Sequence, residues 1–153
     1  MYTISSRQKL PIGIDKAWEF FSDPKNLNSI TPDSMNFQTL SGDERKMFAG
    51  QIIRYKISPF SGISMEWVTE ISHIQDKVFF VDEQRFGPYK FWHHKHFFKE
   101  IDGGVEIEDL VHYKLPFGFI GRLVHPILVI PKLNEIFSFR KQKLNELFGE
   151  FKP

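Results

Sequence analysis

Hydrophobic and polar side chains alternate along most of the chain up to residue 115. Alternation with a period of two indicates a β-strand with one buried face. It predicts an opening strand over 2–11, followed by six strands over 35–40, 50–58, 63–74, 78–86, 91–101 and 104–115. Most connections between these six are short, such as Ser61-Gly62 and Asp102-Gly103. Short connections join antiparallel neighbours, so we predict an antiparallel meander.

Two regions have helical spacing instead. After the opening strand, Asp15 can cap a short helix through Ala17 to Phe21, and Pro24 can open a second short helix that runs to Ile30. A longer helix is predicted from Pro131. Its side chains recur at three-to-four-residue spacing on one stripe: Leu133, Ile136, Phe137, Arg140, Leu144, Leu147, Phe148 and Phe151. We therefore expect an α+β fold, with one long C-terminal helix on one sheet.

Between the last strand and this helix lies an apolar stretch, residues 117–130, with the sequence FGFIGRLVHPILVI. It is too short and too interrupted for a membrane span, which needs about 20 apolar residues. We expect a short helix or a segment that covers the open end of the sheet. An exposed apolar surface here would indicate a site for a protein partner.

Strand alternation also predicts which side chains point inward, because successive residues face opposite sides of a sheet. In 104–115 the odd-numbered row is apolar except for one acid. In 91–101 two lysines favour the odd-numbered row as the solvent side, and in 78–86 burial of the row from Val78 to Phe86 buries one charge instead of two. Together with one helix residue, these rows supply the candidate ligand-binding residues: Trp67, Phe80, Asp82, Gln84, Trp92, His94, His96, Phe98, Asp109, Tyr113 and Arg140.

Composition supports a binding function and excludes several others. Aromatic residues make up 16% of the chain, and rings line apolar pockets well. The net charge is +1, so no field favours nucleic acid as a partner. The absence of cysteine excludes thiolate metal sites and a cysteine nucleophile. The first residues lack the layout of a signal peptide, so we expect one cytoplasmic domain over residues 1–153.

Three motifs carry a family resemblance: GPYKFWHHKHFF at 87–98, DLVHYKLPFGFIGRL at 109–123 and IFSFRKQKL at 136–144. With the predicted element order, they resemble the SRPBCC superfamily of START-like proteins, which includes polyketide cyclases. The motifs are similar to a bacterial ligand-binding subgroup, some of whose members carry a cell-division-inhibitor label. The resemblance implies a helix-grip fold, in which about seven strands grip the C-terminal helix around a cavity, and binding of a hydrophobic or aromatic small molecule.

The residues leave other functions open. A cavity histidine or acid could act as a general base on a polyketide-like or other cyclic ketone, or the chain could be a regulatory interaction protein. His94 and His96 can reach one metal ion, with Asp109 as a third ligand, but histidines hydrogen-bonded within the cavity wall are favoured over a metal site. For these histidines we predict Asp109 and Gln84 as partners. We predict no metal and no other cofactor.

Overall fold

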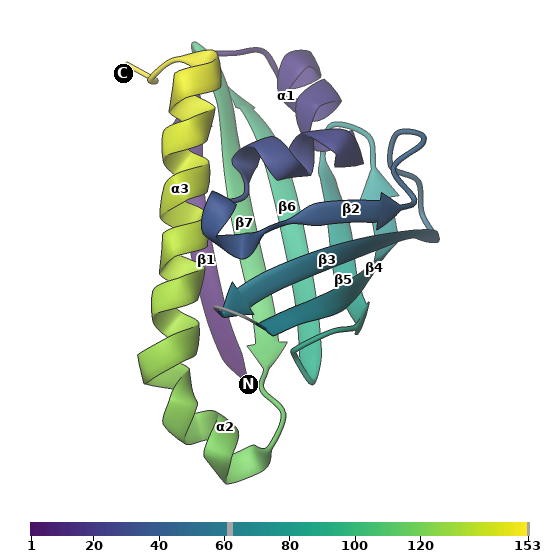
Figure 1. Ribbon diagram of the computed structural model, residues 1–153. Coiled ribbons are helices and arrows are strands. Elements are labelled where there is room, and N and C mark those ends of the chain that lie inside the picture. The colour runs from purple at the N-terminus through teal and green to yellow at the C-terminus, as the bar shows by residue number, and fades with distance from the viewer. Residues whose placement is uncertain (61–62, 153) are drawn as a thin grey trace.

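The described residues form one seven-stranded antiparallel sheet that curves around a long C-terminal helix (Figure 1). This computed structural model describes residues 1–60 and 63–152, so the predicted turn at Ser61-Gly62 lies outside the described residues. The strand order is β1-β7-β6-β5-β4-β3-β2, and the predicted antiparallel meander is confirmed. The strands are β1 Tyr2–Leu10, β2 Gln38–Ser41, β3 Gln51–Phe60, β4 Ile63–Gln75, β5 Phe79–Phe86, β6 Phe91–Ile101 and β7 Gly104–Lys114.

Helices lie at both ends of the sheet and along its concave face. The helix α1 (Ile14–Phe21) and two 3-10 helices, η1 (Pro24–Ile30) and η2 (Asp33–Met35), follow β1. After β7 and residues 115–117, the helix α2 (Gly118–Val124), a π-helical turn η3 (His125–Val129) and α3 (Ile130–Phe148) follow one another without a break. In Figure 1, α1 lies near the C-terminal end of α3, whereas α2 lies near the chain's N-terminus.

Three predicted helix and strand boundaries are corrected. Gly13, not Asp15, is the N-cap of α1, and Asp15 lies in the first turn, where it pairs with Lys77 at 2.6 Å. The strand predicted over 35–40 starts only at Gln38, because residues 33–35 form η2 and the next residue is left-handed. The last helix ends at Phe148, so Phe151 lies beyond it.

The inward rows predicted from alternation are buried in most strands. In β7 the odd-numbered row from Val105 to Tyr113 is buried, and in β6 the row from Trp92 to Phe98 is buried. The predicted row of 78–86 is wrong at both ends, since Val78 is 42% exposed and Phe86 is 64% exposed. Val78 lies in the turn before β5, which begins at Phe79. Phe86 lies beside a register shift in the pairing of β4 with β5, where a bulge interrupts alternation.

Residues 117–130, hereafter the apolar segment, form α2 and the π-helical turn that leads into α3. Most of their large apolar side chains are exposed instead of covering the sheet: Phe117, Phe119, Ile120, Leu123, Ile127, Leu128 and Ile130. Gly121, His125 and Val129 are its buried residues. Among the described residues, no helix combines the length and the apolar character needed to cross a membrane.

Candidate functional site

A cavity of about 610 Å³ lies between the concave face of the sheet and α3. Most of its wall is apolar or aromatic, with Trp67 and Trp92 from the sheet and Phe137 from α3. The most exposed of the described lining residues are Phe117, at 80%, and Leu128, at 46%. Both belong to the apolar segment, so the cavity reaches the surface beside α2.

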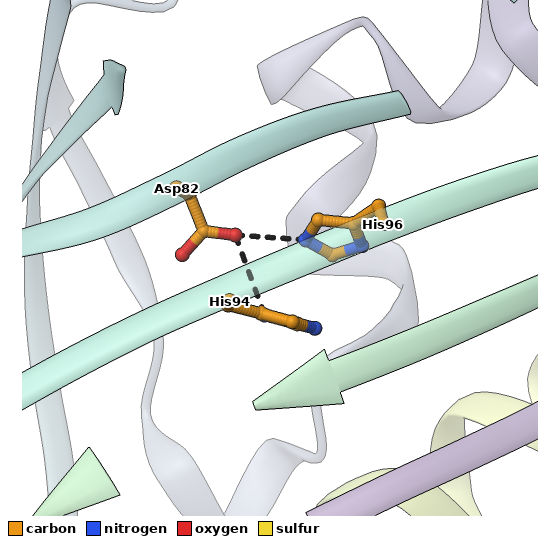
Figure 2. A group of neighbouring side chains, drawn as sticks. All are labelled: Asp82, His94 and His96. Atoms are coloured by element: carbon orange, nitrogen blue, oxygen red, sulfur yellow. Dashed lines mark hydrogen bonds and ion pairs between the residues drawn. The ribbon is translucent and has the colours of Figure 1, made fainter. Parts of the chain in front are cut away.

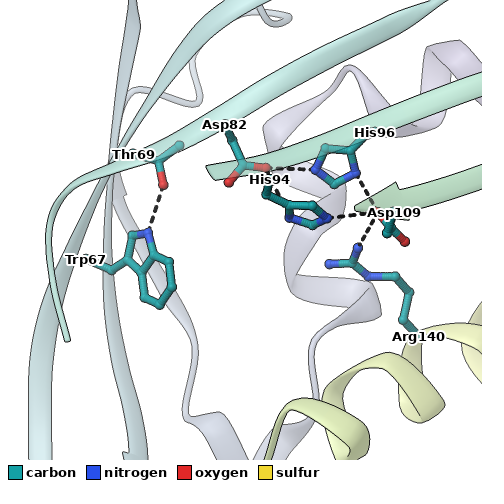
Figure 3. Close-up of polar contacts among 7 residues, drawn as sticks. All are labelled: Trp67, Thr69, Asp82, His94, His96, Asp109 and Arg140. Carbon is teal, nitrogen blue, oxygen red and sulfur yellow. Dashed lines mark hydrogen bonds and ion pairs between the residues drawn. The ribbon is translucent and has the colours of Figure 1, made fainter. Parts of the chain in front are cut away.

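A cluster of ionisable side chains interrupts this apolar wall (Figure 3). Asp82 comes from β5, His94 and His96 from β6, Asp109 from β7 and Arg140 from α3. Strand register brings them together, because Asp82 pairs with His94 and His96 pairs with Asp109 across neighbouring strands. We call these five residues the polar cluster. Three strands and one helix therefore meet at one buried point.

Two aspartates hold the imidazoles from opposite sides. Oδ2 of Asp82 lies 2.7 Å from Nε2 of His96 and 3.3 Å from Nδ1 of His94. Oδ1 of Asp109 lies 3.0 Å from Nε2 of His94 and 2.8 Å from Nδ1 of His96. Nη1 of Arg140 also donates to Oδ1 of Asp109, at 3.3 Å. The two imidazoles lie close together and are tilted by 39°, with ring centroids 3.8 Å apart.

These contacts determine which groups are ionised. Burial disfavours the charge of Asp109, but Arg140 and the two histidines outweigh it and lower the pKa of Asp109 well below its usual value. Burial likewise opposes the charge of Asp82, yet the histidines and Arg140 lower the pKa of Asp82. Burial and the neighbouring His96 lower the pKa of His94, despite its carboxylate contacts. For His96, the contacts with both carboxylates outweigh burial and raise the pKa.

Three buried nitrogens of this region lack a hydrogen-bond acceptor in the described part of the chain: Nε1 of Trp92, Nε of Arg140 and Nδ1 of His96. Nδ1 of His96 is close to Asp109 but outside hydrogen-bond geometry. Trp67 is different, because its Nε1 donates to Oγ1 of Thr69 at 3.0 Å (Figure 3). Unpaired buried donors are costly, so this part of the wall is suited to a ligand that carries an acceptor.

The cavity wall contains seven of the eleven predicted site residues: Trp67, Phe80, Asp82, Trp92, His94, His96 and Arg140. Asp109 lies behind the histidines and is not part of the wall. Phe98 is also absent from the wall and packs in the core, with its ring centroid 5.3 Å from that of Trp18.

Gln84 and Tyr113 also lie away from the cavity wall. The Gln84 amide donates to the carbonyl of Tyr89 at 2.6 Å and accepts from its N–H at 3.1 Å, so it braces the turn before β6. The predicted pairing of Gln84 with the histidines is therefore wrong, and Asp82 takes its place. The Tyr113 hydroxyl contacts Nε2 of His125 at 2.8 Å.

Sequence reasoning missed two parts of the site. The wall includes residues from the short helices, such as Phe21 and Ile30, and from the apolar segment, such as Phe117 and Leu128. These residues are not on strands, so alternation carried no signal for them. His125 was the single imidazole in an apolar run, a pattern that could have indicated its buried contact with Tyr113.

The polar cluster also contains a group with metal-ligand spacing. One donor atom each from Asp82, His94 and His96 lies within 4.8 Å of the others (Figure 2). The third ligand proposed from sequence was Asp109, whereas this geometry selects Asp82.

Comparisons with known proteins identify the fold. No protein-family model and no curated protein matches the chain. Protein CV1439 from Chromobacterium violaceum superposes with a TM-score of 0.74 at 14% identity, covering 99% of this chain and 100% of that one. The major latex-like protein 151 from Panax ginseng has a TM-score of 0.69 at 12% identity, covering 96% and 97%.

Ara h 8.0201 is a further solved structure with the same architecture. It has a TM-score of 0.64 at 16% identity, and the match covers 95% of this chain and 98% of that chain. At such low identity these similarities show the fold alone. The predicted α+β helix-grip fold is confirmed.

Proposed function

We propose that the protein binds a hydrophobic or aromatic small molecule between the sheet and α3. The observation that carries this proposal is the cavity of about 610 Å³, whose wall is largely apolar with one polar cluster. Small-molecule sites typically have this volume, an apolar lining and a few polar groups that fix orientation. A solid core of the same size would be filled by side chains.

The wall divides into two roles. Trp67, Phe80 and Trp92 contribute apolar contact area, since large rings bury much surface with few degrees of freedom. Arg140 and His94 orient the polar end of the ligand. The unpaired donors on Trp92 and Arg140 favour a ligand with a carbonyl, hydroxyl or carboxylate oxygen. The ligand is thus an apolar body with at least one oxygen acceptor.

The direct experiment is native mass spectrometry of the purified protein, followed by identification of any small molecule released on denaturation. A fluorescent naphthalene sulfonate then serves as a defined probe. Trp67 and Trp92 line the cavity, whereas Trp18 does not. In a Trp18→Phe background, tryptophan fluorescence therefore reports on the cavity, and we expect saturable quenching by the probe.

A matched pair of variants on α3 separates cavity binding from surface adsorption. Ile136 lines the cavity and Leu147 is 49% exposed on the same helix. Ile136→Trp fills part of the cavity and should weaken probe binding at least about tenfold, while Leu147→Trp should leave it unchanged. Equal affinity in both variants would show that the probe binds elsewhere, and the proposal would fail.

A second candidate is an enzyme that acts on a polyketide-like or other cyclic ketone. The observation that favours it is His94, an imidazole with a lowered pKa at the cavity wall between two carboxylates. A neutral imidazole there is suited to general base catalysis. Turnover of a cyclisable polyketide analogue that disappears in His94→Ala would favour this function over binding alone. Turnover that survives His94→Ala would remove it.

We further propose membership of the bacterial ligand-binding SRPBCC subgroup, on the three sequence motifs. The motif residues Trp92, His94 and His96 lie at the cavity wall, and Arg140 faces the same space. Their shared location supports a role in ligand binding. Substitution of His93, the outward neighbour in the same motif, should leave probe affinity unchanged.

A further inference from the structure

We propose that Asp82, His94 and His96 form a binding site for a divalent first-row transition metal ion. Two imidazoles and one carboxylate are a donor set that such ions take in proteins, usually with remaining coordination positions open. The site requires no assumption about the organic ligand, so it stands or falls separately from the proposed function.

The donor atoms converge from one side (Figure 2). Oδ2 of Asp82 faces Nδ1 of His94 at 3.3 Å and Nε2 of His96 at 2.7 Å. Metal bonds of about 2.0–2.2 Å in tetrahedral geometry separate neighbouring ligand atoms by roughly 3.3–3.5 Å. The distance to His94 already fits, and the contact with His96 has to open by about 0.6–0.8 Å.

Asp109 contacts the opposite nitrogens of both imidazoles. Its Oδ1 lies 3.0 Å from Nε2 of His94 and 2.8 Å from Nδ1 of His96. Histidines that bind metals typically donate their other N–H to a carboxylate, which fixes the ring and the tautomer. Among the described residues, Asp109 hydrogen-bonds Nε2 of His94, which turns Nδ1 of that ring toward Asp82, and lies close to Nδ1 of His96 without hydrogen-bond geometry.

Charge in the cluster favours a cation. Metal coordination requires both imidazoles to be neutral, and in that state the two carboxylates and the Arg140 guanidinium leave an excess of one negative charge in a buried region. The carboxylates raise the pKa of His96, so binding releases a proton wherever that imidazole is charged. Arg140 contacts Asp109 and not the three donors, with Nη1 at 3.3 Å from Oδ1 (Figure 3). Its positive charge therefore lies on the far side of the histidines from Asp82.

The three donors face the cavity, whereas Asp109 does not. A metal ion held by Asp82, His94 and His96 would therefore keep its open positions toward the apolar space. Such an ion takes an oxygen donor from a bound molecule, for example a carbonyl, an enol or a carboxylate. This is the same end of the wall where Trp92 and Arg140 have unpaired donors.

Cobalt(II) titration of the full chain, prepared without a histidine tag and freed of metal by a chelator, tests the site. We expect one equivalent of Co²⁺ to bind and to give visible d–d absorption bands of a four- or five-coordinate ion. Added Zn²⁺ should displace it and abolish the bands. The same additions should raise the melting temperature, because the ion binds only the folded chain.

Variants locate the ion. Asp82→Asn and His96→Ala should each weaken Co²⁺ binding by more than about 100-fold, and Asp109→Asn, which only orients the rings, by about 10- to 100-fold. His93→Ala is the matched control, because His93 is adjacent to His94 but contacts Glu83 at 2.6 Å on the outer face of β6. It should bind Co²⁺ like the unmodified chain.

Circular dichroism of each variant establishes that it is folded before titration. If His96→Ala does not fold, the conservative Asp82→Asn and the His93→Ala control still decide the result. Absence of one-equivalent binding in the unmodified chain would overturn the site. Binding that survives Asp82→Asn but is lost in His93→Ala would place the ion on the outer face and overturn it as well.

Discussion

The polar cluster and the apolar segment are opposites in what they bury. The cluster places five ionisable side chains inside the protein, and each contacts at least one other member. The apolar segment places large apolar side chains outside, with Ile127 at 72% and Phe119 at 65% exposed. In the described chain, the ionisable groups, whose burial is unfavourable, contact one another, whereas the apolar side chains of the segment are left exposed to solvent. This difference indicates that the cluster is integrated in the protein interior, whereas the segment packs against the rest of the protein through few side chains.

The contrast has a functional side. Both regions contribute to the same cavity, the cluster at its wall and the segment where it reaches the surface. The exposure of the segment is the condition that a protein-partner site requires. That partner remains a prediction.

Arg140→Leu should give the largest effect, because it leaves the buried Asp109 carboxylate without its cation. Removing one partner of a buried pair costs about 3–5 kcal/mol. Urea unfolding of the chelator-treated protein measures this loss. The matched control is Arg7→Leu, since Arg7 pairs with Glu108, the neighbour of Asp109, on the outer face. That exposed pair should contribute little. Equal losses in the two variants would contradict the contrast between buried and exposed contacts.

Alternation in the sequence predicted which residues of the polar cluster point inward, but it did not predict correctly which of them contact one another. It placed His94, His96 and Asp109 on inward rows because β6 and β7 have no bulge. It could not distinguish Asp82 from Gln84 as the partner, since both lie on the same predicted row of β5. That choice depends on the register of β5 against β6, which the turn between them sets.

The apolar segment could not be predicted in the same way. Its run of apolar residues predicts that these side chains pack against another apolar surface. The open end of the predicted sheet was the surface expected to cover them. Within the apolar segment, only Gly121, His125 and Val129 are buried. Pattern reveals which residues avoid water, but not whether the fold offers a surface to cover them.

Two side-chain substitutions to alanine within the apolar segment test the same comparison, with smaller expected changes in the free energy of unfolding. Val129 is 8% exposed and Ile127 is 72% exposed, although they are two residues apart. Val129→Ala should cost about 1–2 kcal/mol for the lost apolar contact. Ile127→Ala should change the free energy of unfolding by less than about 0.5 kcal/mol. Denaturant midpoints measure both changes. A large loss for Ile127→Ala would mean that the segment packs more closely than its exposure indicates.

The smallest effect expected is a pH dependence of the packing of the apolar segment against β1 and β7, which we call its attachment. His125 lies with its Nε2 2.8 Å from the Tyr113 hydroxyl and its ring stacked on Tyr2, centroids 3.6 Å apart. Burial lowers the pKa of His125 from its usual 6.5. The pKa of His125 is lower when the segment is packed against β1 and β7 than when it is detached and His125 is in solvent. The detached segment therefore binds a proton more readily than the packed one. The attachment is therefore complete above pH 6.5 and weakens as the pH falls below it.

Amide hydrogen-exchange protection factors of α2 and η3, compared at about pH 7.5 and about pH 5.5, measure this effect. We expect lower protection at the acidic pH in α2 and η3, with β6 and β7 much less affected. His125→Gln is the control, because its amide oxygen can accept from Tyr113 but does not titrate, so protection should no longer change with pH. If the pH dependence persists in His125→Gln, another group governs the attachment, and the segment is less separate from the cluster than the contrast implies.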